Sequence, residues 1–198
     1  MGKVGILGGS FDPVHNAHIK LAECAYKELK LDKVIFMPAH IQPFKANNKV
    51  TDESHRLNML KLAVEKYTYF EVSDLEIRMG GKSYTARTLS ELKKEYEELV
   101  FILGADSYLS LSRWYMPEKI FELAEIACAV RDDVDMSALK QKESEYSKTF
   151  LGRTSFLKME RTDISSTEIR NAILNNETIT DLIDEKVYAY IRENKLYV

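Results

Sequence analysis

Residues 4–18 read VGILGGSFDPVHNAH and decide the fold of this chain. A short apolar strand over 4–7 ends in Gly8 and Gly9, a turn follows, and a helical pattern opens with two histidines three residues apart. Backbone N–H groups at such a turn, the positive end of a helix dipole and imidazole side chains all attract an anion. The stretch therefore predicts a phosphate site between the first strand and the first helix.

Strand-like and helix-like segments alternate along the rest of the chain. Apolar residues at helical spacing predict helices over 17–30, 52–66, 85–98 and near 136–147, followed by two terminal helices. Short apolar runs predict strands at 4–7, 34–37, 70–72, 100–103, 126–130 and 156–159. This alternation is typical of an α/β protein with a Rossmann-like, doubly wound, mostly parallel sheet and helices on both faces. We expect one domain over 1–198, with a small helical C-terminal part at about 163–198.

The amino-acid composition limits which kinds of partner this protein can bind. A chain of 198 residues that is 45% hydrophobic can bury a sizeable core. Its net charge of −3 argues against a general nucleic-acid binder but allows a small anionic ligand. No apolar run reaches membrane-spanning length, and the first one lacks the positive leader of a signal peptide. Two cysteines within helical and strand patterns predict reduced thiols and a cytoplasmic protein.

A second anion site is predicted late in the chain, where residues 163–170 read DISSTEIR. Ser165 and Glu168 fit a helix capping box, which would explain the segment without any ligand. Capping does not account for Arg170, because a cation early in a helix opposes the helix dipole at a cost of about 0.3–1 kcal/mol. An anion at this helix end would reverse that sign and would recruit Ser165, Ser166 and Arg170 together.

Three interpretations of the histidine pair compete. A metal site would need further ligands, and the whole chain contains only four histidines. Alternatively, His15 and His18 simply pack beside a helix capped by Asp12 or Asn16. Phosphate binding also explains the glycine turn ahead of the pair, so we prefer it.

Two positions at or beyond the end of the strand over 100–103 are further candidates. Asp106 follows Gly104 there and either caps a helix or meets a ribose hydroxyl. Trp114 is the only tryptophan, and it lies in the polar stretch 107–117, which we expect to be irregular. A tryptophan is more often part of the core, but in this setting a half-exposed stacking surface is credible.

These motifs resemble those of the nucleotidyltransferase superfamily, whose (T/H)xGH motif follows the first strand. Here that motif is HNAH at 15–18, with Ala17 in place of the usual glycine. The late ISSTxxR motif of the superfamily is matched in full at 164–170. More closely, the chain resembles the bacterial nicotinate-nucleotide adenylyltransferases over nearly its full length, through SYTARTL at 83–89, GADS at 104–107, RWY at 113–115 and a terminal VYAYIRENKLY at 187–197.

The resemblance implies that the adenylyl group of ATP, which binds with Mg²⁺, is transferred to nicotinate mononucleotide, giving deamido-NAD and pyrophosphate. It implies that the phosphates are held by His15, His18, Ile164, Ser165, Ser166 and Arg170. The residues implied to line the dinucleotide cleft are Gly8, Gly9, Ser10 and Phe11, with Gly104 and Asp106 on the adenosine. Those implied to hold the nicotinate nucleotide are Lys45, Tyr84, Thr85 and Trp114.

Several alternatives stay open. The sister pantetheine-phosphate adenylyltransferases share the first motif, but their chains are typically shorter and lack the SYT and tryptophan pair. Residue types alone do not exclude nicotinamide mononucleotide as acceptor, a non-catalytic nucleotide sensor, or a metal hydrolase built on the histidines. Arg87 stands where SYTxDTL is the commoner form, which puts the role of this position in doubt. We expect small-molecule partners, no nucleic acid, no membrane and, as one option, a homodimer.

Overall fold

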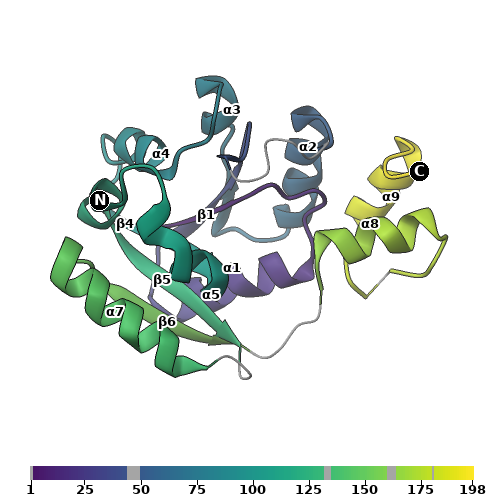
Figure 1. Ribbon diagram of the computed structural model, residues 1–198. Helices are drawn as coiled ribbons and strands as arrows, with labels where there is room; N and C mark the ends of the chain where they lie inside the picture. The colour runs from purple at the N-terminus through teal and green to yellow at the C-terminus, as the bar shows by residue number, and fades with distance from the viewer. Residues whose placement is uncertain (1, 44–49, 132–134, 160–163, 180) are drawn as a thin grey trace.

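The centre of the molecule is a six-stranded parallel sheet (Figure 1). The computed structural model describes residues 2–43, 50–131, 135–159, 164–179 and 181–198. The strands are β1 Lys3–Gly9, β2 Lys33–Pro38, β3 Phe70–Val72, β4 Glu98–Gly104, β5 Ala124–Arg131 and β6 Thr154–Met159. Their spatial order is β3-β2-β1-β4-β5-β6, and each neighbouring pair is parallel. This confirms the predicted doubly wound sheet, whose order reverses between β1 and β4.

Helices cover both faces of this sheet. They are α1 Asn16–Glu28, α2 Glu53–Val64, α3 Leu75–Met79, α4 Thr85–Leu92, α5 Ala105–Ser110, α6 Pro117–Leu123, α7 Met136–Phe150, α8 Ser166–Leu174 and α9 Glu185–Glu193, with a 3₁₀ turn, η2, at Leu111–Arg113. Figure 1 places α8 and α9 together beside α1 and α2, as the expected helical C-terminal part. No helix in the described part of the chain is long and apolar enough to span a membrane.

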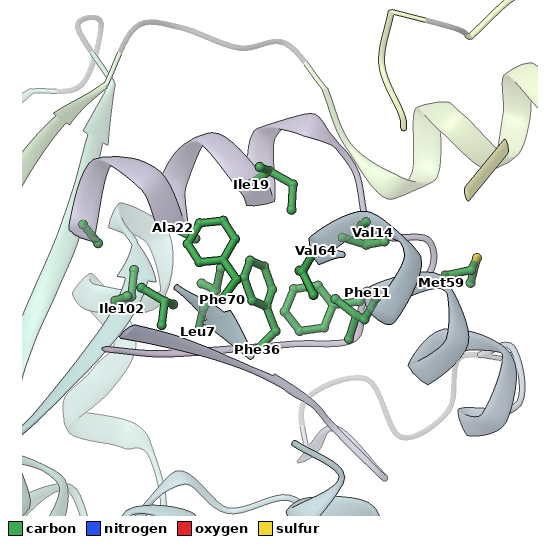
Figure 2. Packing of buried hydrophobic residues seen from close by; sticks show 14 of the residues in the cluster. Leu7, Phe11, Val14, Ile19, Ala22, Phe36, Met59, Val64, Phe70 and Ile102 are labelled. Atoms are coloured by element: carbon green, nitrogen blue, oxygen red, sulfur yellow. The ribbon is translucent and has the colours of Figure 1, made fainter. Parts of the chain in front are cut away.

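Successive side chains of a strand point to opposite faces of the sheet, so each strand contributes to two separate hydrophobic cores. Leu7 and Ile102 join the cluster that packs against α1, α2, α8 and α9. Their neighbours Ile6 and Phe101 join the cluster beneath α4 to α7. Figure 2 shows Leu7 and Ile102 beside Ala22 of α1 in the first cluster. Both faces of the sheet are therefore buried, and the ends of the strands are left for ligands.

Two local predictions were wrong. The helix expected over 85–98 ends at Leu92, because β4 begins at Glu98, which pairs with Lys3 of the central strand. The stretch 107–117, expected to be irregular, contains α5, η2 and the start of α6. The stretch is mostly polar, but Tyr108 and Leu111 within it are fully buried and anchor these short helices.

Candidate functional site

A cavity of about 520 Å³ opens at the carboxyl ends of the central strands, where the strand order reverses. Several predicted site residues line it, and they come from four separate segments: Gly8, Gly9, His18, Tyr84, Thr85, Gly104, Asp106 and Trp114. The cavity therefore brings together the residues expected to bind the adenosine and those expected to bind the nicotinate nucleotide.

The two histidines lie against each other at the start of α1. Their ring centroids are 3.7 Å apart, and the backbone N–H of His15 donates to Nδ1 of His18 at 3.2 Å. Because Nδ1 accepts this hydrogen bond, the neutral ring of His18 carries its proton on Nε2. His18 lines the cavity, whereas His15 is buried behind it, and its Nδ1 has no hydrogen-bond partner among the described residues.

Both rings are neutral near pH 7. Burial lowers the pKa of His15 to about 4, partly offset by Glu168. Burial also lowers the pKa of His18 well below its usual value, and the adjacent His15 lowers it further. The site therefore offers His18 as a neutral hydrogen-bond donor rather than as a cation.

We expect the free energy of unfolding to fall as the pH is lowered from 7 to 5. Unfolded His15 binds a proton near pH 6.5, whereas folded His15 binds one near pH 4, so acid favours the unfolded chain. The loss from His15 alone should be about 2 kcal/mol at pH 5. Urea unfolding at the two pH values measures it, and His15→Asn, which does not titrate, should show a smaller loss. Equal losses in both proteins would contradict this assignment.

The second predicted motif meets the first one at the loop between β1 and α1. Ser166 Oγ donates to the carbonyl of Pro13 at 3.0 Å, and Arg170 Nη1 donates to the carbonyl of Asp12 at 2.7 Å. Ser165 caps α8: its Oγ accepts from the N–H of Glu168 at 3.2 Å and donates to the carboxylate of Glu168 at 2.6 Å. The protons of both serine hydroxyls are thus engaged within the protein, so a phosphate here would meet backbone N–H groups and Arg170.

Eight of the predicted site residues do not line this cavity or lie outside the described residues: Ser10, Phe11, His15, Lys45, Ile164, Ser165, Ser166 and Arg170. Phe11 is 1% exposed, and its ring packs between His18 and Phe36 at centroid distances of 5.0 and 5.9 Å. Its side chain therefore supports His18 instead of lining the cleft. Ser10 and Ile164 are not among the lining residues, and Ser10 Oγ donates to Gln42 Oε1 at 2.6 Å. Lys45 lies in 44–49, outside the described residues.

The cavity also contains polar groups that the sequence pattern did not reveal. Gln42 lines it beyond the end of β2. Glu76 is buried in its wall, accepts a hydrogen bond from Thr88 Oγ1 at 2.6 Å, and has its pKa raised by that burial. Tyr115 lines the rim beside Tyr84, with ring centroids 4.5 Å apart. Only Tyr115 had a local signal, its place next to Trp114.

Arg87, whose role the sequence left in doubt, lies outside the lining residues. Its guanidinium stacks over Tyr84 at 5.4 Å and over Tyr115 at 5.7 Å, measured to the ring centroids. It therefore braces two aromatic side chains of the rim. Within the described residues, no group of three or more His, Cys, Asp or Glu side chains could hold a metal ion.

Comparisons with known proteins agree with this geometry. The Cytidylyltransferase-like family model matches residues 6–172. A protein of Clostridium beijerinckii named "Probable nicotinate-nucleotide adenylyltransferase" is 41% identical, and one of Clostridium tetani with the same name is 38% identical. In both cases the match covers 100% of both chains.

Solved structures share the fold. The nicotinic acid mononucleotide adenylyltransferase of Plasmodium falciparum complexed with NaAD is 21% identical, with a TM-score of 0.77 over 100% of this chain and 98% of that one. The same enzyme complexed with APC gives a TM-score of 0.74. The family match and the full-length identities show that this chain belongs to the nicotinate-nucleotide adenylyltransferases, within the Cytidylyltransferase-like family.

Proposed function

We propose that this protein transfers the adenylyl group of ATP to nicotinate mononucleotide, giving deamido-NAD and pyrophosphate in NAD biosynthesis. The observation that carries the proposal is the meeting of two helix starts at one loop. Arg170 of α8 contacts Asp12 of the loop that leads to His15 and His18 of α1. The adjoining cavity has room for a nucleotide.

The residue roles follow from their places in the site. We assign the ATP phosphates to His18, Arg170 and the backbone around Gly9, with His15 behind His18 as its support. The adenosine part goes to Gly104 and Asp106 at the end of β4. Ile164, Ser165 and Ser166 hold the start of α8, so that its N–H groups and Arg170 face the phosphates.

The nicotinate nucleotide is assigned to the other end of the cavity. Tyr84 and Thr85 meet its carboxylate at the start of α4, and Trp114 stacks on the pyridine. Lys45 is proposed for the nucleotide phosphate on the resemblance alone. The roles of Ser10 and Phe11 are indirect: Ser10 holds Gln42, and Phe11 holds His18.

The reaction needs no general base. The 5′-phosphate of nicotinate mononucleotide is already ionised near neutral pH, and one of its oxygens attacks the α-phosphorus of ATP in line. The bond between this phosphorus and the bridging oxygen breaks, and pyrophosphate leaves with the electron pair. His18 Nε2–H and Arg170 then act by stabilising charge on the phosphoryl oxygens, and the cavity acts by positioning.

We propose that Mg²⁺ enters as Mg-ATP. A magnesium ion is commonly held by substrate phosphates, waters and one or two carboxylates, so a dedicated cluster of protein ligands is not required. The carboxylate of Asp106 on the cavity wall fits such a site. When bound, the ion would neutralise charge on the phosphate oxygens.

The test is to incubate the pure protein with Mg-ATP and, in separate reactions, nicotinate mononucleotide, nicotinamide mononucleotide or phosphopantetheine. Adenylylation of the nicotinate nucleotide at the highest kcat/KM supports the proposal. Preferred adenylylation of phosphopantetheine or of the nicotinamide nucleotide would replace the proposed acceptor. Absence of turnover with all three, with ATP still bound, would indicate a nucleotide sensor.

Trp114→Ala should raise KM for nicotinate mononucleotide roughly tenfold, the scale of one stacking contact, and leave KM for ATP nearly unchanged. The reason is that Trp114 lines the cavity at the nicotinate end. Steady-state kinetics with each substrate varied in turn measures the split. An unchanged KM for the nicotinate nucleotide would remove Trp114 from the binding site.

Cellular location and assembly are parts of the same proposal. We propose a cytoplasmic enzyme that acts as one domain over 1–198, because Cys24 and Cys128 are both free and α8 and α9 pack into the core shared with α1. We also propose a homodimer, and sedimentation of the pure protein tests this assembly.

A further inference from the structure

We propose that Tyr197, which follows α9, is a positioning residue for the loop 10–15. Its hydroxyl holds the Asp12 carboxylate away from the bound triphosphate. This inference rests on the proposed function, because it takes loop 10–15 to be the phosphate-binding loop. It gives the segment after α9 a part in the reaction, although that segment lies outside both motifs.

The contact joins the two ends of the described structure. Tyr197 Oη donates to Asp12 Oδ1 at 2.6 Å, and the backbone N–H of Thr51 donates to Asp12 Oδ2 at 3.2 Å. Asp12 is only 6% exposed and is not among the residues that line the cavity. Each oxygen of this buried carboxylate therefore has a hydrogen-bond donor within the protein.

Three backbone carbonyl groups of the same loop also accept hydrogen bonds from side chains of the protein. Arg56 Nη1 donates to the carbonyl of Ser10 at 2.8 Å, and Arg170 Nη1 donates to the carbonyl of Asp12 at 2.7 Å. Ser166 Oγ donates to the carbonyl of Pro13 at 3.0 Å. These bonds occupy carbonyl oxygens that would otherwise repel a phosphate. In the Ser10–Phe11 and Pro13–Val14 peptides the N–H points opposite to the bonded carbonyl, whereas Pro13 has no N–H.

The Asp12 carboxylate is the one full negative charge in this loop. Because it stands only three residues before His15, a rotation toward the cavity would repel the triphosphate. A tyrosine can hold it, because its hydroxyl donates a hydrogen bond without adding a further charge to the loop. Burial and the neighbouring Asp12 raise the pKa of Tyr197, so the hydroxyl keeps its proton at neutral pH.

A purely structural role is the alternative, because the rings of Tyr197 and Tyr188 both pack against the same core. Tyr197→Phe separates the two roles: it keeps the ring and removes only the hydroxyl. Tyr188→Phe is the matched control, since Tyr188 is a half-buried tyrosine of α9 whose ring lies beside the guanidinium of Arg192. Within the described residues its hydroxyl has no hydrogen bond to loop 10–15. Both variants are made in the full chain.

For Tyr197→Phe we expect kcat to fall roughly tenfold, the scale for losing one hydrogen bond to a buried charge. KM for nicotinate mononucleotide should stay within about twofold, because the residues assigned to the pyridine end, Tyr84 and Trp114, lie at α4 and after η2 and not on loop 10–15. Tyr188→Phe should keep the wild-type kcat. A lower melting temperature of Tyr197→Phe with an unchanged kcat would show a structural role only and would overturn the proposal.

A double-mutant cycle with Asp12→Asn tests whether Tyr197 acts through this carboxylate. We expect Asp12→Asn to keep kcat within about threefold of the wild-type value, because the charge that Tyr197 restrains is gone, and Tyr197→Phe to lower kcat no further in that background. Multiplied effects of the two substitutions would overturn the proposal. If Tyr197→Phe is unfolded at the assay temperature, Asp12→Asn decides alone, and a roughly tenfold or larger fall in its kcat would reject the idea, because the carboxylate itself would then be needed. A wild-type protein that forms no deamido-NAD would instead refute the proposed function.

Discussion

His18→Ala should lower kcat for deamido-NAD formation by about two to three orders of magnitude, the scale for removing one donor to developing charge. The backbone N–H of His15 occupies Nδ1 of His18, so the proton of the neutral ring sits on Nε2. His18 is also the member of the histidine pair that lines the cavity. Its loss therefore removes a hydrogen-bond donor that the transition state needs, while leaving the glycine turn in place.

A second set of variants tests which ring nitrogen of His18 donates the hydrogen bond. His18→Gln places an amide N–H₂ near the former Nε2, so it should recover roughly tenfold in kcat over His18→Ala, whereas His18→Asn should not. His55→Ala is the control, because His55 is a histidine of α2 that hydrogen-bonds Tyr190 at 2.9 Å. It should keep the wild-type kcat. A kcat of His18→Ala within about threefold of wild type would reject His18 as a phosphate ligand.

The doubly wound parallel sheet was accessible from the sequence for a physical reason. Buried parallel strands are continuous apolar runs, and the helices between them have one apolar face, so both patterns survive in a single chain. The limits of elements that depend on tertiary contacts could not be predicted from the sequence. The pairing of Glu98 with Lys3 ends one helix early, and the burial of Tyr108 and Leu111 creates short helices in a polar stretch.

The residues of the candidate site also fall into two groups, those that local sequence motifs predicted and those that depend on tertiary packing. The glycine turn, His15, His18 and Arg170 are local motifs, and the structure brings them to one loop. Glu76, buried in the cavity wall, has no such motif, since its position depends on the packing of α3 against β2.

Contacts between segments far apart in sequence were even less accessible. The hydrogen bond between Tyr197 and Asp12 joins residues from the two ends of the sequence, and no spacing rule connects them. The hydrogen bond of Arg56 to Ser10 is of the same kind. Sequence patterns therefore indicated the groups that touch substrate better than the groups that hold those in place.

Arg170→Ala should lower kcat/KM for ATP roughly a hundredfold, because two charge-assisted contacts are lost together. A guanidinium has five N–H donors, and here Nη1 donates to the carbonyl of Asp12 and Nη2 to Thr167 Oγ1 at 3.2 Å. Within the described residues the other N–H donors have no hydrogen-bond partner, so we assign them to a triphosphate. The bond to Asp12 also fixes the loop, so its loss should destabilise the fold by about 1–3 kcal/mol.

Two further variants separate charge from geometry. Arg170→Lys keeps the positive charge but cannot hold the Asp12 carbonyl and a phosphate in one planar fork, so it should recover only about tenfold of the loss. Thr167→Val removes the hydroxyl that accepts from Nη2 and should change kcat/KM by less than about threefold. Kinetics with ATP varied, alongside urea unfolding of each variant, gives both quantities. If Arg170→Ala loses stability but keeps kcat/KM for ATP, the guanidinium braces the loop without touching substrate, and the two helix starts do not share one triphosphate.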